Sequence, residues 1–147
     1  YSPCSREPTH PELYWYGIHG VEILYTVMGP GCESVSRLSS DDFDVAVGRW
    51  SDGRIGSFRG IRKGASGYGG VAYGSKEIRS LGGFDGYAPL VHAIAEFFRT
   101  GKAPVEPAET LELYAFMSAA DLSKERGGAP VAIAEVLEAA RREARGE

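Results

Sequence analysis

The sequence has few cysteines, no long hydrophobic run and no strong cluster of basic residues. Its two cysteines, Cys4 and Cys32, form no C-x-x-C pair, so we expect reduced thiols and neither a metal site nor a disulfide scaffold, although a single bridge stays possible. No apolar run approaches the roughly 18 residues needed to cross a bilayer, so no membrane partner is expected. The densest basic stretch, residues 59–63, is too small to predict a nucleic-acid partner.

The composition indicates one compact domain preceded by a short connecting segment. Hydrophobic residues make up 43% of the 147 residues, enough for a sizeable core. Three prolines in the first eleven residues predict that residues 1–13 are an extended connecting segment, followed by a domain over residues 14–147. An opening on Tyr1 is typical of a cut inside a longer chain. Any targeting signal would then lie upstream of Tyr1, and the sequence at hand leaves the compartment open. We expect a cytoplasmic protein by default, with export as the alternative.

The order of the predicted elements indicates the fold class. Periodicity predicts strands over residues 33–38, 43–50, 54–62, 71–73 and 77–81, and helices over residues 17–28, 87–101, 108–124 and 132–145. Because Asp52-Gly53 is a strong hairpin signal and the other connections are short, the strands should pair mainly antiparallel. We therefore predict an α+β fold with an open, mostly antiparallel sheet and helices packed on one face. The predicted contact surface toward another subunit or domain comprises Trp50, Phe58, Tyr68 and Tyr73.

The first helix carries a narrow polar stripe on an otherwise apolar surface. His19, Glu22 and Thr26 stand at i, i+3 and i+7, which places them in one line along the helix. The stripe is either the wetted edge of a surface helix or the lining of a cleft in which His19 acts as an acid–base group. The glycine-rich stretch 64–70 precedes a strand instead of a helix, so we interpret it as a flexible hairpin loop and not as a phosphate cradle.

Several motifs together resemble a known enzyme family. Gly17-x-His19-x-x-Glu22 with Gly29, followed by Gly74-Ser75-Lys76, is similar to the C-terminal domain of the glucose–fructose oxidoreductase, inositol dehydrogenase and rhizopine-catabolism family (Gfo/Idh/MocA). The helix that ends in residues 97–102 and the passage from Pro104-Val105 into residues 109–112 agree with the same pattern. The resemblance covers about residues 14–131.

The resemblance implies a two-part enzyme of which this chain is the second part. The parent would be an NAD(P)-dependent oxidoreductase that acts on a sugar, polyol or related hydroxy compound. Its N-terminal Rossmann domain would bind NAD or NADP and is absent from this chain, which has no strand–GxGxxG–helix unit and should bind no dinucleotide alone. The implied partners are the small-molecule sugar or polyol, the missing Rossmann domain and further copies of the chain through the sheet face.

The resemblance also implies roles for individual residues. His19 matches the histidine that acts as the acid–base catalyst or binds the substrate hydroxyl, sharing the work with a lysine in the missing domain. Many members have an aspartate four residues before this histidine, but here Trp15 occupies that position, so Glu22 is the candidate to orient His19. Tyr14, Trp15 and Tyr16 are, with Glu22, the predicted substrate-binding residues, since aromatic rings stack on sugars. The alternative is a non-catalytic nucleotide- or sugar-sensing module, or a dimerisation module, of the same fold.

Overall fold

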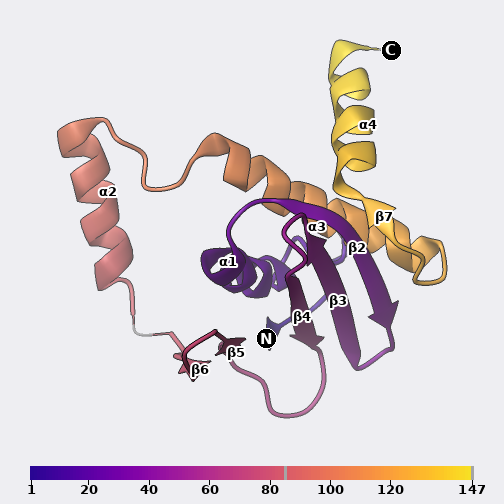
Figure 1. Ribbon diagram of the computed structural model, residues 1–147, viewed down its shortest axis with the longest axis horizontal. Helices are drawn as coiled ribbons and strands as arrows, with labels where there is room; N and C mark the ends of the chain where they lie inside the picture. Colours follow the sequence, from indigo (N-terminus) through magenta and orange to yellow (C-terminus); the bar gives the residue numbers. More distant parts are fainter. Residues whose placement is uncertain (85, 147) are drawn as a thin grey trace.

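The structure is a computed structural model, and it describes residues 1–84 and 86–146 (Figure 1). The strands are β1 (Ser2–Pro3), β2 (Cys32–Ser39), β3 (Phe43–Trp50), β4 (Ile55–Ile61), β5 (Gly70–Tyr73), β6 (Ile78–Leu81) and β7 (Val131–Ala132). The helices are α1 (Gly17–Met28), α2 (Ala88–Thr100), α3 (Pro107–Glu125) and α4 (Ile133–Arg145). None of the helices in the described part of the chain is long and apolar enough to cross a membrane.

The main sheet has the strand order β1-β4-β3-β2-β7, and β5 and β6 form a separate hairpin. β1 pairs in parallel with β4, whereas β4–β3, β3–β2 and β2–β7 are antiparallel pairs. The Asp52-Gly53 turn joins β3 to β4, with Gly53 at a φ of +87° and the Arg54 amide donating to the Asp52 side chain at 3.0 Å. The prediction of an α+β fold with an open, mostly antiparallel sheet is confirmed.

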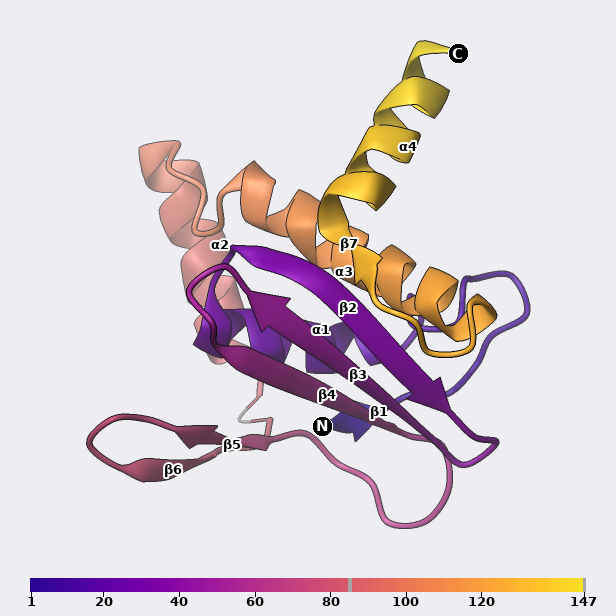
Figure 2. The same cartoon turned by 45° about the vertical axis from the view of Figure 1, so that its right-hand side comes forward.

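Two helices cover one face of the sheet. α1 packs on β4 and α3 packs on β2, and the turned view shows both on the same side of the strands (Figure 2). The core between them is aromatic, because the Tyr25 ring lies 5.8 Å from the Trp50 ring and 5.9 Å from the Phe116 ring. The other fully buried apolar side chains include Leu13, Val21, Val35, Phe58, Met117 and Val131.

The structure corrects the predicted contact surface at two of its four residues. Trp50 and Phe58 are each only 1% exposed and lie in the core under the helices. The sequence conceals this because the inward positions beside Phe58 on β4 are glycines, so neither face of the strand reads as apolar. A Cβ at Gly56 would lie 2.8 Å from Leu24 Cδ1, and a Cβ at Gly60 would lie 2.8 Å from Cys4 Cβ. These glycines therefore let α1 and the chain around Cys4 approach the sheet closely.

The opposite face of the sheet carries exposed apolar side chains. Leu38, Val47 and Ile55 are exposed there, and the Arg59 guanidinium lies 4.6 Å from the centre of the Phe43 ring. On the hairpin, Tyr73 is exposed, while Tyr68 in the preceding loop is partly buried. A homo-oligomer through the sheet face, which stays a prediction, would use this surface instead of Trp50 and Phe58.

The opening residues belong to the folded body. β1 adds a parallel strand at the edge of the sheet, and Ser2, Cys4 and Leu13 are fully buried. A two-residue strand has no periodicity that sequence reasoning could detect, so the expectation of a connecting segment missed its pairing with β4. Tyr1 also pairs with the glycine-rich loop, since its amino group donates to the Gly69 carbonyl at 2.6 Å.

A buried cluster of charged side chains joins the sheet to α3. Arg37 on β2 is fully buried and donates through Nε and Nη2 to Asp44 Oδ1 at 3.0 and 2.9 Å. Its Nη2 also donates to Glu12 at 2.6 Å, and its Nη1 donates to Asp121 on α3. Arg62 donates to the second oxygen of Asp44. Each charged side chain named in this cluster therefore lies against a partner of opposite charge, as buried ion pairs require.

The carboxyl groups of this cluster respond in opposite directions. Burial acts to raise the pKa of Asp44, but hydrogen bonds from Arg62 and Ser39 and the charge of Arg37 outweigh it, so the pKa is lowered. Burial raises the pKa of Asp121 to about 6: the charge of Arg37 opposes the rise without offsetting it, and the negative charge of Glu12 adds to it. Asp121 thus changes its charge at a higher pH than an ordinary aspartate.

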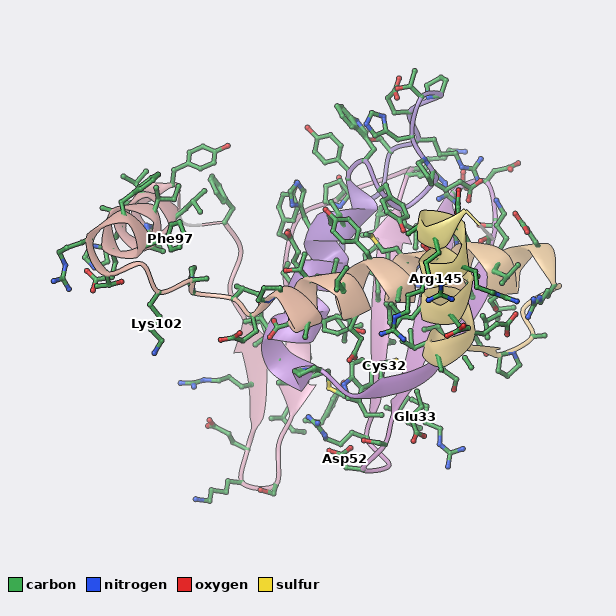
Figure 3. The ribbon with its side chains drawn as sticks, turned by 90° about the horizontal axis from the view of Figure 1, so that it is seen from above. Cys32, Glu33, Asp52, Phe97, Lys102 and Arg145 are labelled. Carbon is green, nitrogen blue, oxygen red and sulfur yellow. The ribbon has the colours of Figure 1, made fainter. Side chains whose placement is uncertain are left out.

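Helix α2 forms at its predicted position but does not pack on the sheet. None of its thirteen residues, all of them described, is buried. Figures 1 and 3 show it standing apart from the sheet and from α1 and α3, with Phe97 on the detached helix and Lys102 on the coil that follows. Periodicity identified the helix correctly, because its apolar face is regular, but this pattern does not say what the face packs against.

Candidate functional site

The polar stripe of α1 forms as its spacing predicts. His19 and Glu22 lie one turn apart, with 3.0 Å between His19 Nδ1 and Glu22 Oε2. Both side chains are about half exposed, at 50% and 53%. When His19 carries its proton on Nδ1, it donates to Glu22, and Nε2 keeps a free lone pair that can accept a proton. The pair therefore has the arrangement of a base with an orienting carboxylate.

The stripe lines a cavity of about 530 Å³. From α1 the cavity is lined by His19, Glu22, Ile23 and Thr26, and from the loops by Tyr68, Gly82, Gly83, Phe84 and Tyr87. The Tyr68 ring meets the His19 ring edge to face at 6.1 Å, and the Phe84 and Tyr87 rings meet at 5.1 Å. Of the two interpretations of the stripe, the lining of a cleft agrees with its position in the structure. The volume of the cavity suits a small organic molecule.

Sequence reasoning did not assign Tyr68, Phe84 and Tyr87 to this site. The sequence predicts Tyr68 on a contact surface and Tyr87 at the start of the helix over residues 87–101. Tyr68 lies within the glycine-rich loop, next to Gly69, which is held by two hydrogen bonds to Tyr1 at 2.6 and 3.2 Å. Aromatic residues beside glycines show no periodic pattern that would assign them to a site. The sequence offers only composition as a signal, since each of the two glycine-rich stretches contains an aromatic residue, Tyr68 in one and Phe84 in the other.

The three predicted aromatic substrate-binding residues lie in different surroundings. Tyr14 turns toward α3, where its hydroxyl lies 2.5 Å from Ser118 Oγ and donates to the Tyr114 carbonyl at 3.1 Å. Burial raises the pKa of Tyr14. Its hydroxyl is therefore engaged in packing between the opening segment and α3, away from the cavity lined by His19.

Trp15 and Tyr16 lie just before α1, near His19 but outside the cavity lining. Trp15 packs against the ring of His10 at 5.0 Å and is 43% exposed. Tyr16 bridges the two, with its ring 5.9 Å from Trp15 and 6.0 Å from His19. Because α1 begins at Gly17, Trp15 precedes the helix, and Glu22 is the residue that binds the His19 ring.

A second cavity, of about 620 Å³, lies between α1, β4 and the β5–β6 hairpin. It is mostly apolar, and its charged residue is Arg54, which donates to Asp52 at 2.6 Å and to the Met28 carbonyl at 3.0 Å. It contains no pair of acid–base groups comparable to His19 and Glu22 among the described residues. The first cavity is therefore the candidate active site.

The two cysteines are free and buried, as expected for reduced thiols. Burial is the main reason why the pKa of Cys4 and that of Cys32 both rise to about 11, and the nearby carboxylates Asp44 and Glu112 add to it. A thiol that stays protonated at neutral pH is a poor nucleophile. Burial and a raised pKa therefore disfavour a nucleophilic role for both thiols.

The similarity of the chain to known proteins lies in its fold. No protein-family model matches the sequence, and no curated protein matches it. Among solved structures, the chain is similar to a protein from Desulfitobacterium hafniense DCB-2 that is provisionally named an NADPH-dependent oxidoreductase, with a TM-score of 0.63 and 16% sequence identity. The match covers 84% of this chain and 48% of that protein, so the chain spans about half of its length. At this identity the likeness establishes a shared fold: this chain has the architecture of part of that protein.

Proposed function

We propose that this chain is the substrate domain of an NAD(P)-dependent oxidoreductase that acts on a sugar, a polyol or a related hydroxy compound. The observation that carries the proposal is the His19–Glu22 pair at 3.0 Å on the wall of a cavity with three aromatic rings. The motifs that resemble the Gfo/Idh/MocA family and the fold shared with part of a protein named for NADPH support the same assignment. The name of that protein favours NADP over NAD.

His19 would handle the proton of the substrate hydroxyl. Oxidation of an alcohol removes a hydride from carbon and a proton from oxygen, and the dinucleotide of the parent protein would supply the hydride acceptor. His19 Nε2 would take the proton, and Glu22 would stabilise the resulting imidazolium through Nδ1–H. The rings of Tyr68, Phe84 and Tyr87 offer apolar faces to the C–H side of a sugar ring. In the described part of the chain, the glycine-rich loop of residues 64–70 leads into β5 and not into a helix, so this loop does not form a dinucleotide cradle.

The test is replacement of His19 in the full-length parent protein. His19→Asn should lower turnover at least about tenfold. A general base usually contributes more than this, so the threshold allows for another group that takes over part of the role. His92→Asn is the matched control, because His92 lies exposed on α2, outside the residues that line the cavity, and should leave turnover unchanged. Equal turnover of the His19→Asn protein and the wild type would refute the assigned role.

A second candidate is a protein that binds nucleotide and sugar without catalysis. Trp15, in the position where many family members have an aspartate, favours it, since His19 then has one carboxylate partner and stays half exposed. Such a protein would bind NADPH and a sugar in titration calorimetry but would turn over no member of a panel of sugars and polyols. Turnover of any panel member would decide for the enzyme.

A further inference from the structure

The apolar face of α2 is unpartnered. Tyr87, at the start of the helix, and Phe98, near its end, are 70% and 80% exposed. Between them the same face carries Leu90, Val91, Ile94 and Phe97, all exposed. The other side of the helix is polar, with Arg99 Nε donating to Glu96 at 3.0 Å. An amphipathic helix normally buries its apolar face against another element, so we expect a partner to cover this face of α2.

The size of this face suits a stable interface. An aromatic side chain buries about 150–250 Å² and the face carries three of them with three aliphatic neighbours, so it exposes on the order of 700 Å². One side of a standard protein–protein interface is about 800 Å². A patch of this size exceeds what a monomer commonly leaves exposed, roughly 300–600 Å². The face is therefore large enough to hold a folded partner.

The face is continuous with the candidate active site. Tyr87 precedes the first turn of α2, and with Phe84 it forms one wall of the cavity that His19 lines. A body seated on α2 would therefore extend to the edge of this cavity. Hydride transfer requires the dinucleotide to lie about 3–3.5 Å from the substrate carbon. Whatever holds the dinucleotide must thus reach the same edge.

We propose that the apolar face of α2 is the docking surface for the nucleotide-binding domain of the parent protein, which thereby closes the cavity beside His19. This inference rests on the proposed function. The similar solved protein supports it, because about half of its length lies outside the match and is long enough for a further domain. Residues 101–106 join α2 to α3, and no residue of α2 is buried against the rest of the described chain, so a partner can set its position. A second copy of the chain is the competing occupant, but it would bring no dinucleotide site to the cavity.

Hydrogen–deuterium exchange of α2 tests the proposal. We expect the amides of Ala88–Thr100 to exchange at least about tenfold more slowly in the full-length parent protein than in the 147-residue chain, since docking removes local opening. Phe98→Ser should abolish much of this protection in the full-length protein. Leu38→Ser, which removes an equally exposed apolar side chain from the far end of β2, should leave it unchanged. Equal exchange in the two wild-type proteins would overturn the proposal.

Sedimentation velocity distinguishes the second copy as the occupant. We expect Phe98→Ser to leave the association state of the 147-residue chain at about 0.1 mM unchanged. An interface of standard size between two copies would persist at that concentration, and the proposal expects none through α2. A dimer that Phe98→Ser converts to monomer would assign the face to a second copy and overturn the proposal. The exchange experiment and the turnover experiment can fail separately. If α2 is protected in the full-length protein but the His19→Asn protein is fully active, the role assigned to His19 is refuted and the docking surface is not.

Discussion

Asp121 should make the stability of this protein depend on pH in an unusual direction. Its folded-state pKa of about 6 lies above the ordinary value of 3.8, so the folded protein holds this proton more tightly than the unfolded chain does. Its contribution to stability is fully present below pH 3.8 and is lost as the pH rises through 6. A pKa rise of this size corresponds to about 1 to 3 kcal/mol, at 1.36 kcal/mol for each pKa unit and with allowance for coupling to Arg37.

The perturbation is Asp121→Asn, which keeps the shape of the side chain and removes its titration. The unfolding free energy of the wild type minus that of the variant should fall by about 1 to 3 kcal/mol between pH 4 and pH 7. Urea titrations at pH 4, 5, 6 and 7 measure this difference, provided that the m-value stays constant. Glu33→Gln removes one negative charge from an exposed position and serves as the control. A difference that is independent of pH, or that grows as the pH rises, would refute the reasoning.

Three further substitutions or probes test the packing. Gly20→Ala should lower the unfolding free energy by about 2 kcal/mol, since overpacking costs about 1–3 kcal/mol; the added Cβ would lie 2.2 Å from Phe58 Cε2, and thermal unfolding would show the loss. Glu112→Ala should cost about 2 kcal/mol in urea unfolding, because backbone amides lose their acceptor; Glu112 Oε1 accepts from Gly31 and Cys32 at 2.8 Å each. Cys4 and Cys32, with pKa values of about 11, should react with a thiol reagent at pH 8 at least about a hundredfold more slowly than in the unfolded chain. Native thiols that react as fast as unfolded ones would contradict their burial.

Sequence reasoning recovered the elements that periodicity encodes. The bounds of α1, β3 and the Asp52-Gly53 turn follow from local pattern, and so does the His19–Glu22 pair, which depends only on helical spacing. Sequence reasoning failed where a glycine allows close packing, and where two residues in contact are far apart in the sequence. The inward glycines of β4 concealed the burial of Phe58, and the placement of Tyr68 depends on a pairing between Gly69 and Tyr1.

The buried Arg37–Asp44 pair was missed for a related reason. Both residues are charged members of strands, so each alone reads as solvent-facing, and their burial follows from the neighbours that they meet in the fold. The detached position of α2 was equally invisible, because an apolar helix face predicts that something covers it without saying what. Local pattern thus fixes the type of element, and packing partners fix its place.

The tight contact at Gly20 has a consequence for how this fold could change its ligand over evolution. Gly20 follows His19 directly, and Phe58 and Ser2 leave no room there for even a methyl group. Any larger residue at this position would therefore require the core around Phe58 to rearrange. The close packing at Gly20 fixes the place of His19, the proposed acid–base residue, whereas Tyr68 and Phe84 lie in loops, which tolerate changes in length and sequence. If the proposed function holds, new substrate preferences would arise by changes in these two loops, while His19 keeps its place.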